Sequence, residues 1–468
     1  MALHPFSPAR AAWCTPLCLV FLCVLSGVSH ARAATLIVSN LRDDGPGSLR
    51  EALANASNGA SGSESTVTFA PDLKGTIALD SALPEIKTSV AINGRAGLAL
   101  DGGKKTRLFS LAPKGKLSLD GLELRNGRDA SAGGAISNVG GALSATKCTF
   151  TGNRSEGVGG AVAARAGATS LFSDCTFRGN TAKTSGSVVF NADAGGEGAN
   201  TLGAQRCTLE GNSGPAFDNG KESEATLIEV KVSRAATTTG AGAVLNAGKM
   251  SLSRSVLSGN TSQGNAGAVL NAGGSLFVDS CTFSNNAARS GGAIFSAGAL
   301  RIANTTFAFN AAQPAYGGAA LAFGAKSQTA MEFCTFVGNI TTGSTSAGTI
   351  NDSAVGDDPA NFIVRNCLFV ANGTGSFGNL LRDPSSTGDE NGNFAFANAR
   401  VAGLVVDGAG FAALAQNGGP TPTFALKTGS PAIDVAVGTG FPQFDQRGQG
   451  FPRTSGKSAD AGAFETQQ

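Results

Sequence analysis

The residues best suited to chemistry are two adjacent carboxylates and a nearby guanidinium group, Asp357, Asp358 and Arg365. Clustered acids can bind calcium, and carboxylates beside a cation can cleave polysaccharides, although a glycosidase needs two acids at a defined separation. The competing interpretation is structural, because Gly356 and Pro359 enclose the two acids in a turn-like segment. The turn is favoured, with Asp357, Asp358 and Arg365 kept as weak catalytic candidates.

Histidine chemistry is confined to the beginning of the chain. Both histidines, His4 and His30, lie within residues 1–33 together with the single tryptophan, Trp13. If these residues are removed as a leader, Ser-His-Asp and Cys-His nucleophiles and His metal sites are excluded. Tyr316 is the one tyrosine, so the aromatic platforms usual in sugar-binding grooves are scarce.

Six cysteines beyond residue 33 occupy one column of a repeat: Cys148, Cys175, Cys207, Cys281, Cys334 and Cys367. An even number in an exported chain can indicate disulfides. Stacked strands, however, hold their side chains about 4.8 Å apart, wider than the roughly 3.5–4.5 Å between Cβ atoms that a disulfide prefers. No CxxC spacing indicates a metal site. The favoured prediction is a buried ladder of reduced thiols, and bridges are the alternative.

The repeat itself dictates the architecture. Each copy closes with an aromatic residue or leucine three positions before an Asn, as in Phe283 and Asn286, and copies recur about every 23 to 33 residues. Units of this length must stack to bury their apolar faces. Apolar residues alternate with polar ones, as strands require, and a polar corner interrupts the alternation. These features predict a parallel β-helix of roughly ten or more coils, without the helical stretches of a βαβ array.

The same pattern assigns faces within each coil. Cys281 and Phe283 are expected to point inward, whereas Thr282 between them is expected outside, where replacement by alanine would cost little. The closing Asn column, with Asn286 as an example, is predicted to be a turn ladder because Asn tolerates left-handed backbone and bonds locally. A binding role for this column is the alternative.

The first 33 residues have the features of a secretory signal peptide. Arg10 precedes an apolar run at 17–25, and Ala-Arg-Ala at 31–33 is a typical cleavage site. The run is too short to span a membrane, and no later segment is apolar enough to do so. Cleavage would leave 33 basic and 33 acidic residues, which disfavours nucleic acid and anionic membrane surfaces as partners.

The remaining chain divides into three parts. Residues 34–115 are expected to form an N-terminal cap and irregular first coils, with Ser48 and Glu51 as the capping box of a short helix. Residues 116–400 are expected to form the regular coils, and residues 401–468 a C-terminal cap. An anion site at the helix N-terminus is the alternative to the cap.

Particular motifs permit a comparison with known families. Gly-Gly-Ala openings followed by Ile or Val, paired with Phe-x-x-Asn closings, resemble the repeats of polymorphic outer-membrane proteins. Residues 44–52 resemble the opening of bacterial right-handed β-helix proteins. The segments 417–423, 429–434, 445–448, 452–453 and 460–465 are similar to the choice-of-anchor Q domain. The resemblance implies an all-β, right-handed parallel β-helix that is secreted or displayed on the outer surface of a bacterium.

The expected function is therefore a non-enzymatic adhesion, binding or structural module whose partners are extracellular glycans or surface proteins. The first alternative is a carbohydrate-active enzyme, either a polysaccharide lyase or a glycoside hydrolase, because those activities occur on this fold. The second is a calcium-stabilised matrix protein, based on scattered loop acids such as Asp383 and Asp389. No cofactor is expected apart from calcium in this last case.

Overall fold

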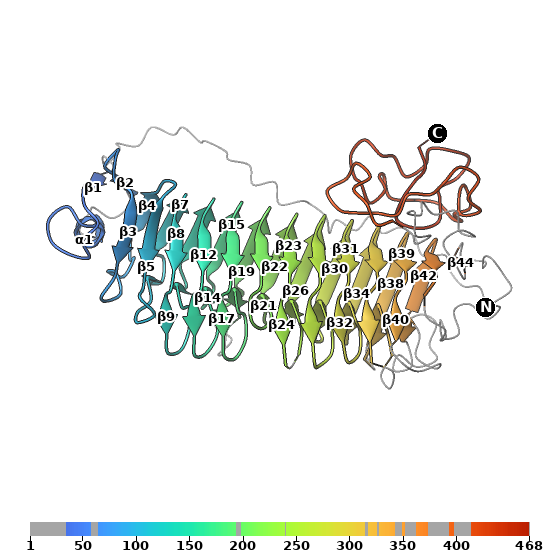
Figure 1. Cartoon of the computed structure of the whole chain (residues 1–468), viewed down its shortest axis with the longest axis horizontal. Helices are drawn as coiled ribbons and strands as arrows, with labels where there is room; N and C mark the ends of the chain where they lie inside the picture. The colour runs from blue at the N-terminus through green and yellow to red at the C-terminus, as the bar shows by residue number, and fades with distance from the viewer. Residues whose placement is uncertain are drawn as a thin grey trace.

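The computed structural model describes residues 34–57, 64–192, 198–238, 240–313, 317–324, 327–341, 349–351, 362–372, 393–396 and 413–467. The predicted signal peptide lies outside these residues. The described chain is almost entirely β-structure, and its paired strands are parallel neighbours from successive coils, as the repeat spacing predicts (Figure 1). The fold is a parallel β-helix.

Three long sheets run the length of the solenoid, and each coil contributes one strand to each of them along most of that length. Sheet A has 13 strands: β1 (Thr35–Val38), β2 (Ser65–Phe69), β4 (Ser89–Asn93), β7 (Lys116–Asp120), β11 (Ala142–Thr146), β15 (Thr169–Ser173), β19 (Thr201–Gln205), β22 (Glu224–Ile228), β26 (Lys249–Ser253), β30 (Ser275–Asp279), β34 (Ala299–Ala303), β38 (Gln328–Glu332) and β42 (Phe362–Arg365). Sheet B also has 13 strands: β3 (Gly75–Ala78), β5 (Leu98–Asp101), β8 (Glu123–Arg125), β12 (Thr149–Thr151), β16 (Thr176–Arg178), β20 (Thr208–Glu210), β23 (Lys231–Ser233), β27 (Val256–Ser258), β31 (Thr282–Ser284), β35 (Thr306–Ala308), β39 (Thr335–Val337), β43 (Leu368–Val370) and β44 (Phe394–Phe396).

Sheet C and two short sheets complete the coils. Sheet C has ten strands: β6 (Phe109–Leu111), β10 (Ile136–Val139), β14 (Val162–Arg165), β18 (Val189–Asn191), β21 (Phe217–Asn219), β25 (Val244–Asn246), β29 (Val269–Asn271), β33 (Ile294–Ser296), β37 (Leu321–Phe323) and β41 (Ile350–Asn351). The short sheets, here called D1 and D2, have three and five strands. D1 contains β9 (Arg128–Asp129), β13 (Arg154–Ser155) and β17 (Thr181–Ala182). D2 contains β24 (Ala236–Thr237), β28 (Thr261–Ser262), β32 (Ala287–Ala288), β36 (Ala311–Ala312) and β40 (Ile340–Thr341).

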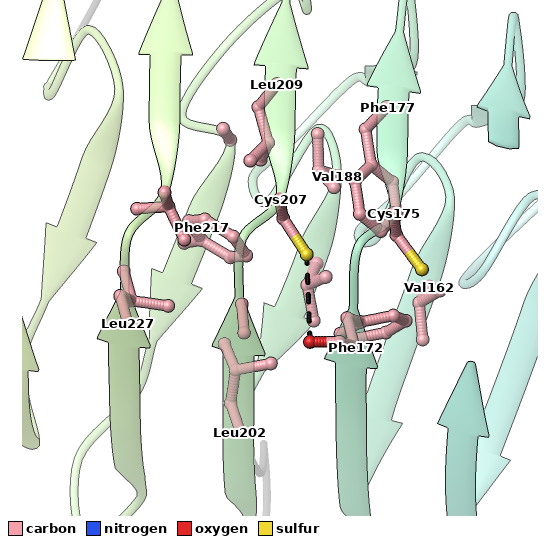
Figure 2. Packing of buried hydrophobic residues seen from close by; sticks show 14 of the residues in the cluster. Val162, Phe172, Cys175, Phe177, Val188, Leu202, Cys207, Leu209, Phe217 and Leu227 are labelled. Carbon is pink, nitrogen blue, oxygen red and sulfur yellow. Dashed lines mark hydrogen bonds between the residues drawn. The ribbon is translucent and has the colours of Figure 1, made fainter. Parts of the chain in front are cut away.

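The interior contains the predicted apolar columns. Phe283 is fully buried and stacks on Phe307 of the next coil, with ring centroids 5.1 Å apart. The six cysteines are all buried and free. Figure 2 shows Cys175 and Cys207 among leucine and phenylalanine side chains, with Cys207 Sγ 3.7 Å from the carbonyl oxygen of Phe172. The thiols therefore lie within the core as small apolar groups.

The predicted corner between sheets A and B is a single residue with left-handed backbone. Asp174 has a φ of 56° and Arg206 a φ of 51°, and the same position is left-handed in most neighbouring coils. One such residue reverses the strand alternation, which explains the odd spacing in the sequence. The corner side chains pair along the solenoid, because Arg206 Nε and Nη2 donate to the Asp174 carboxylate at 2.7 and 2.8 Å.

The closing Asn column is a ladder, but its basis differs from the prediction. Asn286 is fully buried, and its Nδ2 donates to Leu257 O at 2.9 Å and to Asn310 Oδ1 at 3.0 Å. The bonds therefore cross between coils rather than closing a local turn. The left-handed residue is the one before the Asn, for example Gly259 with a φ of 62°. The column is selected for buried hydrogen bonds and not for its backbone conformation.

The predicted N-terminal helix is confirmed as α1 (Leu49–Ser57). Ser48 Oγ accepts from the Glu51 amide at 3.2 Å, and Glu51 Oε2 accepts from the Gly47 amide at 2.6 Å. Leu49 and Leu53 are fully buried, and α1 packs beside β1 and β2, the first strands of sheet A. No helix among the described residues is long and apolar enough to cross a membrane.

Residues 413–467, here called the lateral domain, pack against the outer face of sheet B rather than only following the last coil (Figure 1). Gln446 Oε1 accepts from Thr306 Oγ1 at 2.6 Å, and its Nε2 donates to Thr282 Oγ1 at 2.9 Å. Thr282 points outward as predicted but is fully buried. The expectation that it is solvent-exposed is therefore wrong, because the lateral domain covers it.

The lateral domain is held together by a buried charged network. Arg447 Nη2 donates to Asp445 Oδ2 at 2.6 Å, and the Arg447 guanidinium lies 3.9 Å from the ring centroid of Phe464. Arg453 is 1% exposed, and its Nη2 donates to Asn304 Oδ1 on the solenoid at 2.5 Å. Motif residues of the C-terminal segments therefore lie in the interior of the domain or at its interface with the coils.

Candidate binding groove

The structure does not assemble the acidic candidates from the sequence. Asp357 and Asp358 lie outside the described residues, as do Asp383 and Asp389. Arg365 is described, and its side chain is exposed at the end of β42, in register with Glu332 of β38. Within the described part of the chain, no three His, Cys, Asp or Glu side chains are arranged to hold a metal ion.

A hollow on the described surface comes instead from one shortened coil. Nine positions lead from Asn180 to Val189 of sheet C, but only five lead from Asn212 to the equivalent Phe217. The next coil returns to nine positions, from Ala235 to Val244. Neighbouring coils therefore project loops that the coil of Asn212 lacks, and a notch opens between the loops.

The shortening also interrupts the regular pairing on this side of the solenoid. Ser213 forms single bridges to Thr181 and Ala236, so that the short sheets D1 and D2 are separate. The closing Asn ladder is interrupted at the same place, because Ala235 occupies the Asn position, and it resumes at Asn260 of the next coil. Ser187 Oγ donates at 3.1 Å to the carbonyl oxygens of the short turn, at Gly214 and Pro215. The notch is therefore a fixed feature of the coil.

The resulting groove has a volume of about 940 Å³ and continues from the notch across sheet D2. Its size is at the upper end of the range for ligand sites. The lining is rich in hydroxyl-bearing and small side chains, with one lysine and one carboxylate among the described residues. It comprises Ala182, Lys183, Thr184, Ser185, Ser187, Ser213, Gly214, Pro215, Asp218, Ala236, Thr237, Thr238, Gly240, Ala241, Leu245, Thr261, Ser262, Gln263, Ala287, Ala288, Ala311, Ala312 and Gln313.

Asp218 is the unusual member of this lining. It occupies the middle of β21, an outward position of sheet C filled by uncharged residues in adjacent coils, Phe190 and Leu245. Its side chain is nevertheless 7% exposed, because the groove walls surround it. Burial raises the pKa of Asp218, and a hydrogen bond with the Ser185 side chain partly opposes this. A desolvated carboxylate at this depth is costly and offers a strong acceptor to a ligand.

The sequence contained signals for the groove that the repeat pattern obscured. The short interval between Asn212 and Phe217 was visible as the segment Ser213-Gly214-Pro215. Asp218 stood in a column of uncharged residues and was equally visible. A second buried ladder was also missed, in which Asn191, Asn219 and Asn246 each donate to the next coil at 2.9 Å.

The fold and the groove define a parallel β-helix protein with a lateral groove. Residues 147–165 and 280–297 match the Chlamydia polymorphic membrane protein repeat. Both segments begin at the left-handed corner and end in or just after sheet C, and they bear out the repeat resemblance for those two coils. No match was found among curated proteins.

Among solved structures, the PL6 family alginate lyase AlyGC is similar at 15% identity and a TM-score of 0.41. The alignment covers 78% of this chain and 50% of the lyase. The chain therefore spans about half the length of that protein.

Proposed function

We propose that the protein is an exported surface β-helix that binds an extended polymer in the lateral groove without cleaving it. The observation that carries the proposal is the run of the groove across six successive coils, from Ala182 to Ala312. With about 4.8 Å per coil, this length is about 24 Å. A groove of this length fits several units of a chain better than one small molecule.

A binding role is favoured over turnover by the chemistry of the lining. Asp218 is the one carboxylate among the described lining residues, whereas glycoside hydrolysis uses two at a defined separation. Besides Asp218, the described lining contains no histidine, cysteine or tyrosine for proton transfer, and its one lysine, Lys183, is solvent-exposed. The small side chains of sheet D2, such as Ala287 and Ala311, provide a smooth floor.

Export is part of the proposal and rests on the first 33 residues together with the surface-protein repeat matched at 147–165 and 280–297. N-terminal sequencing of protein recovered from the medium or the cell envelope should begin near Ala34. Cytoplasmic protein that retains Met1 would contradict export. The lateral domain is proposed to correspond to the choice-of-anchor-like segments.

The binding proposal is tested by filling the notch. A copy of residues 262–265 (Ser-Gln-Gly-Asn) inserted between Ser213 and Gly214 restores the loop length of the neighbouring coils. Binding to a panel of polysaccharides and peptides should be lost in this variant and kept by a control with the same insertion between Glu156 and Gly157, outside the lining. Equal binding by both variants would refute the groove as the site.

Turnover is measured on the same panel as release of reducing ends or unsaturated uronides, with and without calcium. No release is expected. Release that disappears in Asp357→Ala or Arg365→Ala would establish the enzyme instead.

A further inference from the structure

The groove carries one charge of each sign among its described lining residues. Asp218 lies in the wall of the notch and is 7% exposed, whereas Lys183 is exposed at the rim. Eight of the lining residues carry hydroxyl groups, and Gln263 and Gln313 add side-chain amides. The described lining therefore offers both donors and acceptors along its length but no net charge.

This balance discriminates between classes of polymer. A polyanion or a polycation meets one like and one opposite charge, Asp218 and Lys183, and so gains no net attraction from the charges of the described lining. A neutral hydroxyl can donate to a carboxylate and accept from an ammonium group or another hydroxyl. Uncharged, hydroxyl-rich chains can therefore hydrogen-bond with both Asp218 and Lys183.

The direction of the groove argues against an extended peptide. Peptides that add to a sheet run along a free strand edge, whereas this groove runs along the solenoid axis, across the strands of sheet D2. At the notch, Ser213 already bridges the strands on both sides, at Thr181 and Ala236. Within the described lining, no strand has a free edge that runs parallel to the groove.

Resting on the proposed function, we infer that the ligand is a neutral oligosaccharide chain and that Asp218 is its principal recognition residue. A sugar hydroxyl donates to the Asp218 carboxylate, which already bonds Ser185 and retains further lone pairs. This charge-assisted bond forms in a desolvated site, so it is stronger than those of the exposed hydroxyls. The Ser, Thr and Gln side chains along sheet D2 then bond successive sugar units more weakly.

The test uses purified mature protein and defined polymers in affinity electrophoresis and calorimetry. The neutral probes are dextran, amylose and mannan; pectate is the anionic probe, chitosan the cationic probe, and a Gly-Ser-Ala repeat the peptide probe. At least one neutral glycan is expected to bind, with an affinity unchanged between about 0.05 and 0.5 M salt because no ion pair forms with the ligand.

Asp218→Asn keeps the side-chain shape and removes the charge, and should weaken the neutral glycan about tenfold to a hundredfold. Asp218→Ser places there the residue found at the equivalent Ser137 and should behave similarly. Either variant suffices if the other fails to fold. The matched control is Asp72→Asn, at an exposed acid outside the groove, which should bind as the wild type does.

The two proposals can fail separately. Binding of pectate, chitosan or the peptide alone, abolished by the notch insertion, would overturn the neutral-glycan inference and leave the groove as the binding site. A neutral glycan that binds equally to wild type and to both Asp218 variants would overturn the role of Asp218. Binding that survives the insertion would remove the groove itself.

Discussion

Gln446 is predicted to hold the lateral domain on the coils, and its replacement by alanine should loosen the domain measurably. The side chain is fully buried and joins two strands of sheet B, since it accepts from Thr306 Oγ1 at 2.6 Å and donates to Thr282 Oγ1 at 2.9 Å. Its Nε2 also lies 3.0 Å from Cys281 O. No other residue of the lateral domain, among those described, is bonded through its side chain to both threonines.

The magnitude follows from the groups that Gln446→Ala leaves behind. The buried Thr306 hydroxyl loses its acceptor, which costs about 1–3 kcal/mol, whereas Cys281 O keeps the Thr306 amide at 2.9 Å. The vacated volume adds about 1 kcal/mol. Gln446→Ala should therefore lower the free energy that holds the lateral domain on the coils by about 2–4 kcal/mol. Thr282→Ala should cost about 1–2 kcal/mol for its bond to Pro422 O, which is 2.7 Å long.

The assay is native-state hydrogen exchange, because a long solenoid need not unfold in one step. The amides of Gly462 and Ala463 bond across the interface to Asn366 O and Thr335 Oγ1, both at 2.8 Å. In Gln446→Ala they should exchange about 30 to 700 times faster, at 1.4 kcal/mol per factor of ten. Thr149→Ala, on an uncovered stretch of the same column, is the matched control for Thr282→Ala. Unchanged exchange rates in Gln446→Ala would refute the docking argument. Equal losses of stability in Thr149→Ala and Thr282→Ala would refute it as well.

Four further changes have defined outcomes. Phe283→Ala should lower the local free energy of unfolding of its coil by about 3–5 kcal/mol in native-state hydrogen exchange, and a loss below about 1 kcal/mol would contradict its burial. Asn286→Ala leaves its hydrogen-bond partners in two neighbouring coils unsatisfied and should lower the free energy of unfolding by about 2–4 kcal/mol. An unchanged free energy of unfolding would show that the ladder is dispensable. A thiol label applied to denatured, unreduced protein should modify all six core cysteines, and labels gained only after reduction would reveal disulfides. Because burial raises the pKa of Asp218, the wild type loses stability relative to Asp218→Asn as pH rises from the ordinary carboxyl pKa through the raised one; a difference that stays constant between pH 3 and 7 would contradict this.

The sequence predicts those features that recur in every coil. Positions such as Cys281 and Phe283 belong to columns sampled many times, so one irregular coil cannot hide the alternation. The helix α1 is equally local, since Ser48 and Glu51 specify its start. The Asn ladder was predicted in place but not in mechanism, because a turn and an inter-coil bond select the same residue type.

The groove and the lateral domain depend on differences between coils, which a search for repeats averages away. A four-residue shortening before Phe217 appears as noise in the spacing, yet it opens the notch because both neighbouring loops keep their length. Asp218 is informative for the same reason. It departs from its column, and a buried acid that breaks a repeat indicates a site more directly than a pair of adjacent acids in a Gly- and Pro-flanked segment, such as those at 357 and 358.

The docking of the lateral domain had its own signal in the outward positions of sheet B. Early coils place Thr151, Arg178 and Glu210 there, all partly or largely exposed. The last coils place apolar residues at the same positions, and these pack against the lateral domain: Ala308, Val337 and Val370. An outward column that turns apolar over consecutive coils would expose a hydrophobic patch, so it requires a cover. The change also determines where the lateral domain docks. Sliding the domain toward β16 and β20 would bury Arg178 and Glu210, and the cost of desolvating those charges opposes such a shift.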